Sequence, residues 1–173
     1  MKEALNDILV VELGTVLTAP LAGMMLADHG ARVIKLRHPN GGGPFRRHAG
    51  ELYSPHFVAY NRNKESIQLD LQSEAGKADL AKLISQADVL LDNYRHGVLQ
   101  RLGFGDERLK ELNPRLVQCS ITGFGVGGPY QDRPCYDAVA VALSGISSQI
   151  VDPENPVVSG PSVSDNITAM YAA

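Results

Sequence analysis

The sequence has few cysteines, no excess of positive charge and no long apolar run, and each absence narrows the class of protein. Its two cysteines, Cys119 and Cys135, form no C-x-x-C pair and no metal-ligand spacing, so we expect a reducing, cytosolic environment. The net charge of −3 gives no general attraction to nucleic acid or to an anionic membrane. No segment approaches the ~18 apolar residues of a membrane span. The opening residues, MKEALNDILVVEL, carry acids within the apolar run, which argues against a secretory signal peptide.

Internal repeats, low-complexity linkers and a clustered set of histidines are also lacking. The five histidines are scattered along the chain, so we predict no metal site. What remains is ordinary for a soluble globular protein, with 44% hydrophobic and 20% charged residues. A chain of 173 residues is long enough for one domain with a substantial core.

Short apolar segments typical of strands alternate with segments of helical periodicity. Strands are expected at residues 8–13, 31–37, 66–71, 88–93 and 115–122, and helices at residues 19–30, 73–87, 106–113 and 137–148. This alternation predicts an open, doubly wound, mainly parallel α/β sheet of Rossmann-like type. In such a sheet, binding sites lie at the carboxyl ends of the strands.

Two long loops begin at such carboxyl ends. The first runs from His38 to about Ser54, and basic residues gather in it and around it: Arg37, His38, Arg46, Arg47, Arg62 and Lys64. Arginine is suited to two-pronged contacts with phosphate, so this loop either holds a phosphorylated ligand or is simply a solvated basic loop. The sequence alone does not decide between a ligand site and a solvated loop.

The second loop, residues 123–136, contains Gly123-x-Gly125-x-x-Gly128 directly after an expected strand. The dinucleotide fingerprint requires a helix to open at once, so that its N-terminus faces a pyrophosphate. Here Pro129 and Pro134 follow, and the loop continues. We therefore predict a flexible glycine loop beside a site rather than a dinucleotide site.

The final segment, SVSDNITAMYAA, is expected to begin a helix with Ser164 as its N-cap and Asp165 in its first turn. Ile167, Met170 and Tyr171 form an apolar stripe at helical spacing. No stop signal follows Ala173, so we expect a helix that is either frayed or truncated. The Asp165 carboxylate could serve as a covalent nucleophile, but the local sequence favours an aspartate that only complements the helix N-terminus.

Six blocks of the sequence, in order, resemble the class III CoA-transferases. This group includes formyl-CoA transferase and the carnitine CoA-transferases, with α-methylacyl-CoA racemase as a relative. The resemblance runs from about Ile8 to the last residue. The blocks are VVELGTVLTAPLAGMMLADHGARVIKL, NRNKESIQLDL, ADVLLDNYRHGVLQRLGF, LNPRLVQCSITGFGVGGPY, CYDAVAVALSG and SVSDNITAMYA.

The resemblance implies a Rossmann-like large domain plus a small domain, in chains more than twice this length that form interlocked homodimers. Residues 1–173 would then be the N-terminal part of the large domain, without the small domain and the C-terminal return segment. The enzyme would be cytoplasmic, with no membrane, nucleic-acid or metal partner. Its substrates would be an acyl-CoA and a carboxylic acid.

The resemblance also implies that Asp165 is the catalytic nucleophile, passing through an aspartyl anhydride and an aspartyl-CoA thioester. Positions that match CoA contacts of the family are Leu17, Thr18, Arg37, His38, Leu69, Asp70, Leu71, Gln72, Asn93, Tyr94, Arg95, Arg101, Arg133, Pro134, Cys135 and Tyr136. Two of them depart from the family pattern. His38 stands where an arginine is usual, so Arg37 or Arg46 would have to take its role, and Gln72 stands where a lysine is common.

Tyr136 separates the activities within the group, because the racemases have a proton-transferring histidine at this position. A phenol is a poor base at neutral pH, so Tyr136 favours a transferase over a racemase. A non-catalytic CoA-binding module is a further alternative. The apolar side chain of Leu17, at a position facing the acyl end, suggests an acyl group less polar than oxalyl.

Overall fold

The computed structural model describes residues 3–40, 53–157 and 160–173. The strands are β1 (Leu9–Glu12), β2 (Arg32–Arg37), β3 (Lys64–Gln68), β4 (Val89–Asp92) and β5 (Val117–Ser120). The helices are α1 (Thr18–Asp28), α2 (Pro55–Asn61), α3 (Glu74–Ile84), α4 (Val98–Arg101), α5 (Asp106–Leu112), α6 (Asp137–Leu143), α7 (Ser147–Ile150) and α8 (Val163–Ala172). The predicted alternation of strands and helices is confirmed.

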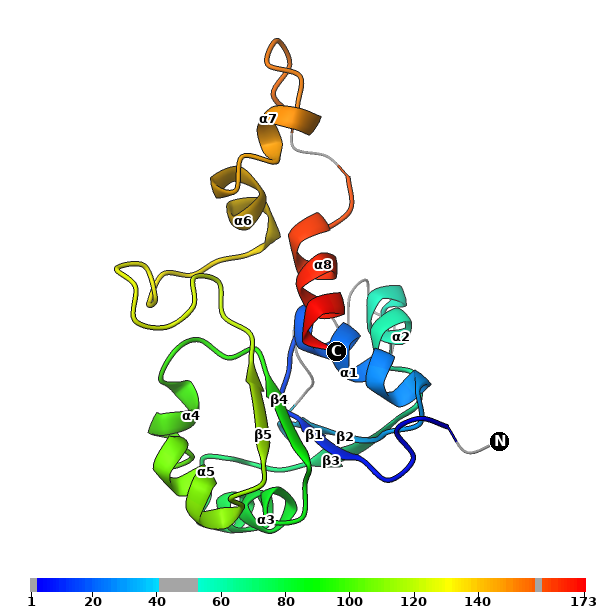
Figure 1. Ribbon diagram of the computed structural model, residues 1–173, viewed down its shortest axis with the longest axis vertical. Helices are drawn as coiled ribbons and strands as arrows, with labels where there is room; N and C mark the ends of the chain where they lie inside the picture. Colours follow the sequence, from blue (N-terminus) through cyan, green and yellow to red (C-terminus); the bar gives the residue numbers. More distant parts are fainter. Residues whose placement is uncertain (1–2, 41–52, 158–159) are drawn as a thin grey trace.

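The five strands form one parallel sheet in the order β3-β2-β1-β4-β5 (Figure 1). At its centre, Val11 of β1 lies opposite Ile34 of β2 and Leu90 of β4. The chain first builds the sheet outward from β1 to β3 and then returns to build the other half from β4 to β5. This is the predicted doubly wound fold, and its direction of winding reverses between β1 and β4.

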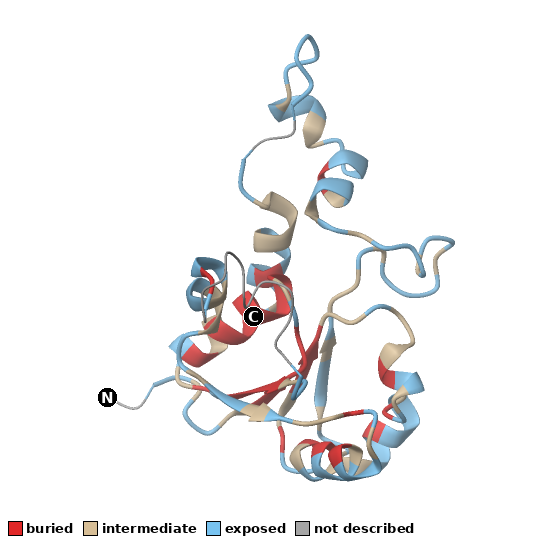
Figure 2. Cartoon of the chain, turned by 180° about the vertical axis from the view of Figure 1, so that it is seen from behind, coloured by how far each residue is buried: buried red, intermediate tan, exposed pale blue. Residues whose placement is uncertain are grey.

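Two apolar cores cover the two faces of the sheet. Val10 and Leu91 pack with α1 and with Ala169 of α8, whereas their neighbours Val11 and Leu90 pack with α3, α4 and α5. Adjacent residues of a strand point to opposite faces, so the continuous apolar run in each central strand supplies both cores. The buried positions are concentrated in α1 and the central strands (Figure 2).

Local backbone chemistry explains where the elements differ from those expected. The helix expected at residues 137–148 is divided, because Gly145 adopts a left-handed φ of 82° after α6. Two short helices, α2 and α4, were not predicted. The signal for α2 was present, since Ser54 accepts a hydrogen bond from the Phe57 amide and Pro55 occupies the first helical position.

Helices α6 and α7 project away from the sheet and lie mostly at the surface (Figures 1 and 2). Exposed apolar side chains gather on α6, α7 and α8: Val139, Leu143, Ile150, Ile167, Met170 and Tyr171. The apolar stripe predicted for the last helix is therefore exposed. Helix α8 instead packs on α1 through its small residues Ala169 and Ala172.

Candidate active site

The crevice where the sheet reverses its winding holds a cavity of about 370 Å³, which we call the aspartate cavity. Its walls come from the turn after β1, the loop after β4, the end of the 123–136 loop and the start of α8. Nine residues predicted for the site line it: Leu17, Thr18, Asn93, Tyr94, Arg95, Pro134, Cys135, Tyr136 and Asp165. The topology thus brings together segments that are far apart in the sequence.

Asp165 lies in the first turn of α8, as predicted, and is half-buried in the wall of this cavity. The N-cap of α8 is Ser162, not Ser164 as the sequence suggested, and Ser162 makes no side-chain capping bond. Burial and, next, the neighbouring Asp137 carboxylate raise the pKa of Asp165. A carboxylate with a raised pKa is more basic than usual, a property that favours nucleophilic attack.

The turn after β1 is strained and is held from across the crevice. Val16 has a φ of 63°, a conformation that a β-branched residue rarely adopts. Asn93 binds Thr15, the residue before Val16, through two hydrogen bonds. Its amide nitrogen lies 2.7 Å from the Thr15 carbonyl oxygen, and its side-chain oxygen lies 2.8 Å from the Thr15 nitrogen. Its nitrogen also lies 2.9 Å from Oγ1 of Thr18. The Asn93 side chain, predicted as a CoA contact, is therefore engaged in holding this turn.

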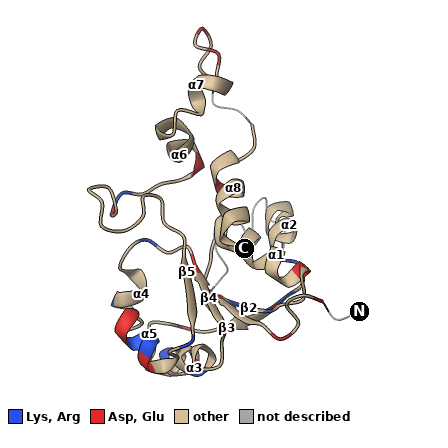
Figure 3. Ribbon diagram, viewed as in Figure 1, with Lys and Arg blue, Asp and Glu red and all other residues tan. Residues whose placement is uncertain are grey.

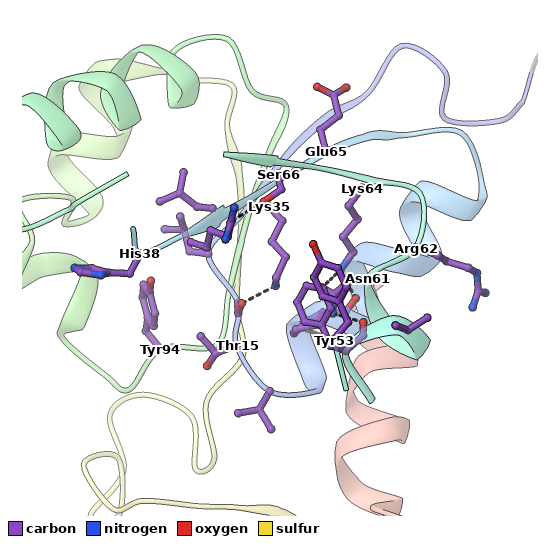
Figure 4. Close-up of a pocket in the computed structure, with 18 residues that line it drawn as sticks. Thr15, Lys35, His38, Tyr53, Asn61, Arg62, Lys64, Glu65, Ser66 and Tyr94 are labelled. Carbon is purple, nitrogen blue, oxygen red and sulfur yellow. Dashed lines mark hydrogen bonds between the residues drawn. The ribbon is translucent and has the colours of Figure 1, made fainter. Parts of the chain in front are cut away.

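A second, larger cavity of about 590 Å³ lies beside the first, and we call it the basic cavity (Figure 4). Arg37 and His38, both predicted for the site, line it together with Lys35 and Lys64. Thr15, Val16 and Tyr94 line both cavities and so form a shared wall. Burial, and next the Asp92 carboxylate, raise the pKa of Tyr94, so its phenol stays protonated at neutral pH.

The remaining predicted residues lie outside the lining of these two cavities. Leu71 is buried in the core on the α3 face, and Asp70 faces His38, with 3.6 Å between Oδ1 and Nε2. The Arg133 guanidinium stacks on the Tyr130 ring, 4.2 Å from its centroid. The others are Leu69 and Gln72 in the loop after β3 and Arg101 at the end of α4. Arg46 and Arg47 fall outside the described residues.

A buried charged cluster that was not predicted from the sequence lies beneath the basic cavity. Glu12 of β1 is fully buried, and its Oε1 and Oε2 lie 2.5 and 2.7 Å from the ammonium groups of Lys35 and Lys64. Lys35 also donates to the Gly14 carbonyl oxygen and Lys64 to that of Pro20. Charged residues within the apolar strand segments were the signal that could have revealed this cluster.

The Gly123-x-Gly125-x-x-Gly128 motif lies in a loop, as predicted. No helix opens after Gly123, because residues 121–136 form a loop, so the dinucleotide fingerprint has no structural context here. Burial raises the pKa of the Cys135 thiol, and Asp165 is the next cause, so a reactive thiolate is disfavoured.

Within the described ranges no group of three or more His, Cys, Asp or Glu side chains comes together to hold a metal ion. In the same part of the chain, none of the helices combines the length and the apolar character needed to cross a bilayer.

Known proteins that resemble this chain identify its family. The profile of CoA-transferase family III matches residues 5–173. The chain is 41% identical to a succinate–glutarate CoA-transferase of Agrobacterium fabrum, over 99% of this chain and 45% of the relative. It is 37% identical to a formyl-CoA:oxalate CoA-transferase of Rhodopseudomonas palustris, over 100% of this chain and 41% of the relative.

Among solved structures, a CAIB/BAIF family protein from Brucella suis superposes with a TM-score of 0.88 at 36% identity, over 99% of this chain and 47% of that one. The chain thus spans less than half the length of these relatives. The matched profile, the identity over nearly the whole chain and the shared fold agree, and the chain belongs to CoA-transferase family III.

Proposed function

We propose that this chain is the N-terminal part of a CoA-transferase that moves CoA from an acyl-CoA donor to a carboxylic acid, with Asp165 as the nucleophile. The observation that carries the proposal is the position of Asp165, half-buried in a cavity at the reversal point of the sheet in a member of this family. The names of the relatives include succinate, glutarate, formyl-CoA and oxalate, which supports small carboxylic acids as the substrate class.

In the proposed reaction, a carboxylate oxygen of Asp165 attacks the thioester carbonyl carbon, and the carbon–sulfur bond breaks. This gives a mixed anhydride and the CoA thiolate. The thiolate attacks the Asp165 carbonyl carbon, which releases the donor acid and leaves an aspartyl-CoA thioester. The acceptor carboxylate then attacks the Asp165 carbonyl carbon and displaces the thiolate, which gives a second mixed anhydride. The thiolate attacks the acceptor's carbonyl carbon in this anhydride, forms the new acyl-CoA and releases the Asp165 carboxylate. Overall, one CoA thioester is converted into another, so substrates and products have similar energies, and the covalent intermediates divide the exchange into easier steps.

Water has to be excluded while the anhydride exists, because hydrolysis would end the exchange. Tyr136 lines the aspartate cavity and is 68% exposed, so this side of the cavity is open to solvent. We propose that the part of the protein beyond residue 173 covers it during the reaction. The exposed apolar side chains of α6, α7 and α8 support a covering partner, either that part of the chain or a second copy in a homodimer.

The shared wall of the two cavities supports an extended CoA site. We propose that the thioester end of CoA occupies the aspartate cavity and that its nucleotide phosphates lie towards Arg37 and His38 in the basic cavity. Tyr94, protonated at neutral pH, would donate a hydrogen bond at the junction. The cytoplasmic location of the enzyme stays a prediction from the sequence.

The test is to trap the covalent intermediate on the full-length protein that carries this sequence. The protein is incubated with a panel of acyl-CoA esters and quenched with hydroxylamine, which converts an activated aspartyl group into a hydroxamate. Peptide mass spectrometry should find the modification on Asp165 in the wild type and not in Asp165→Ala. The donor acid is identified by the ester that gives the signal.

Two other outcomes would replace the proposal. Exchange of the α-proton of an acyl-CoA into deuterated water, without any adduct, would indicate a racemase of the same fold. Measurable CoA binding with neither signal would leave a non-catalytic CoA-binding module.

A further inference from the structure

The carboxylate of Asp137 caps the helix that carries Asp165. Asp137 is the first residue of α6, a position at which an aspartate would ordinarily serve its own helix. Its Oδ1 instead accepts two hydrogen bonds from the first turn of α8, one from the Ser164 hydroxyl at 2.8 Å and one from the Asp165 amide at 3.1 Å. The acidic positions at the facing ends of α6 and α8 are visible in Figure 3.

This contact gives α8 an N-terminal cap, which the residues next to α8 in the sequence do not provide. The first amides of a helix have no partner within the helix, and a side-chain cap normally takes one of them. Ser162, at the N-cap position of α8, makes no such bond. Asp137 therefore fixes the main chain of Asp165 itself, from a helix 28 residues earlier in the sequence.

We infer that Asp137 is a positioning residue for the nucleophile: it holds the main chain of Asp165, and with it the reacting carboxylate, in the wall of the aspartate cavity. The inference rests on the proposed function of Asp165. Its physical basis is the steep dependence of covalent catalysis on geometry, because a misplacement of about 1 Å costs on the order of 10²-fold in rate.

The contact between Asp137 and the start of α8 also brings the Asp137 charge close to the Asp165 carboxylate. A residue that only supported the fold would not change the pKa of Asp165. Burial is the main cause of the raised pKa of Asp165, and the charge of Asp137 is the second. The other titratable or charged side chains around the cavity are Tyr94 and Arg95 after β4 and Cys135 and Tyr136 before α6. In the described residues of α1, the helix on which α8 packs, the only charged side chain is Asp28, which pairs with Arg62 at the far end of that helix.

Two substitutions separate the two effects in the full-length protein. Asp137→Asn keeps an oxygen that accepts from Ser164 and from the Asp165 amide but removes the charge. Single-turnover adduct formation should then stay within a few-fold of the wild type, and its acid limb should move to lower pH, because the pKa of Asp165 falls. Asp137→Ala removes the acceptor, and adduct formation should slow by on the order of 10²-fold, with a smaller change in KM for the acyl-CoA.

Asp132→Asn is the matched control, since Asp132 is exposed, belongs to the same loop region and faces His96 rather than Asp165. Circular dichroism checks that each variant is folded. If Asp137→Ala does not fold, the pH profile of Asp137→Asn still decides the matter. A normal rate in a folded Asp137→Ala would overturn the inference, and so would equal acid limbs in wild type and Asp137→Asn where Asp137→Ala does not fold. Absence of an adduct in the wild type would instead overturn the proposed function.

Discussion

The side-chain amide of Asn93 and the main chain of Thr15 bind each other through two hydrogen bonds across the crevice between β4 and β1. The contact holds the turn in which Val16 has a left-handed backbone. A conformation of this kind costs of order 1–3 kcal/mol and persists only where its surroundings enforce it. The shape of the wall between the two cavities therefore depends on Asn93.

Asn93→Ala is predicted to loosen this wall. Three side-chain hydrogen bonds are lost, so the free energy of unfolding should fall by about 1–3 kcal/mol. Adduct formation at Asp165 should slow as well, because the turn after β1 is free to leave its strained conformation. Urea denaturation and the hydroxylamine trap measure the two effects.

Asn113→Ala is the matched control for that change. The Asn113 amide nitrogen binds the carbonyl oxygens of Ile84 and Ala87 at 3.0 and 2.7 Å, at the opposite end of the strands. Its loss should lower stability to a similar degree while leaving the adduct rate of the folded protein unchanged. If both variants lose rate equally, Asn93 has no special relation to the site.

Gly123→Ala is predicted to disturb the cavity from the 123–136 loop. A methyl group at Gly123 would collide with Cβ of Cys135, which lines the aspartate cavity. Relieving the overlap has to move the Cys135 segment, and overpacking of this kind costs typically about 1–3 kcal/mol. We expect slower adduct formation, measured under single-turnover conditions at saturating acyl-CoA.

The neighbouring Gly128→Ala provides the comparison, because a methyl group at Gly128 meets nothing within 4 Å. It should be neutral in both stability and rate. A Gly123→Ala variant that reacts as fast as Gly128→Ala would show that the Cys135 segment can move without consequence for the site.

The fold could be predicted because its signals are local. Apolar strand segments, a helix stop such as Gly30 and proline positions each depend on a few neighbouring residues, and together they specified the parallel sheet. The start of β3 was missed because Lys64 and Glu65 are charged, and such residues are depleted in strands. Lys64 and Glu65 belong to the sheet because they pair with β2, and the local sequence pattern carries no information on that pairing.

The site was predictable only in part, because its decisive contacts join distant segments. Asp165 lies in the first turn of the last helix, as predicted, but local rules favoured a helix-dipole partner over a nucleophile, and only the resemblance pointed to the nucleophile. The hydrogen-bond partners of Asp137 lie 27 and 28 residues away, so no local pattern could reveal its role. Lys64 was counted with a basic loop, yet its ammonium group is buried against Glu12.

Glu12→Gln is predicted to destabilise the protein strongly. Glu12 is the shared counter-ion of Lys35 and Lys64, so the substitution leaves two buried ammonium groups without a negative partner. Breaking a buried ion pair in this way costs about 3–5 kcal/mol. Urea denaturation at neutral pH measures the loss.

Glu65→Gln is the control for Glu12→Gln, because it makes the same chemical change in a solvent-exposed pair with Arg32. A pair of that kind contributes at most about 1 kcal/mol. Similar losses for the two variants would show that the buried cluster contributes no more than a surface ion pair.

Lys64→Met is predicted to change how stability depends on pH. The Lys64 side chain is only 2% exposed, and burial lowers its pKa to about 8 from the ordinary 10.5, partly opposed by the attraction of Glu12. Below pH 8 the lysine is charged in both the folded and the unfolded protein, so the cost of burying the charge is fully present. Between about pH 8 and 10.5 the unfolded protein binds the proton and the folded protein does not, so the free energy of unfolding rises with pH.

The measurement is the difference in the free energy of unfolding between wild type and Lys64→Met, by urea denaturation from pH 7 to 10.5. Across this range the free energy of unfolding of the wild type should rise by up to about 3 kcal/mol relative to that of the variant. The absolute offset is not diagnostic, because the carbonyl oxygens of Pro20 and Tyr60 lose a donor in the variant at every pH. For Lys82→Met, at an exposed lysine, the free energy of unfolding should change with pH in the same way as for the wild type. A difference for Lys64→Met that is flat with pH would mean that the buried ammonium keeps an ordinary pKa and that Glu12 fully offsets its burial.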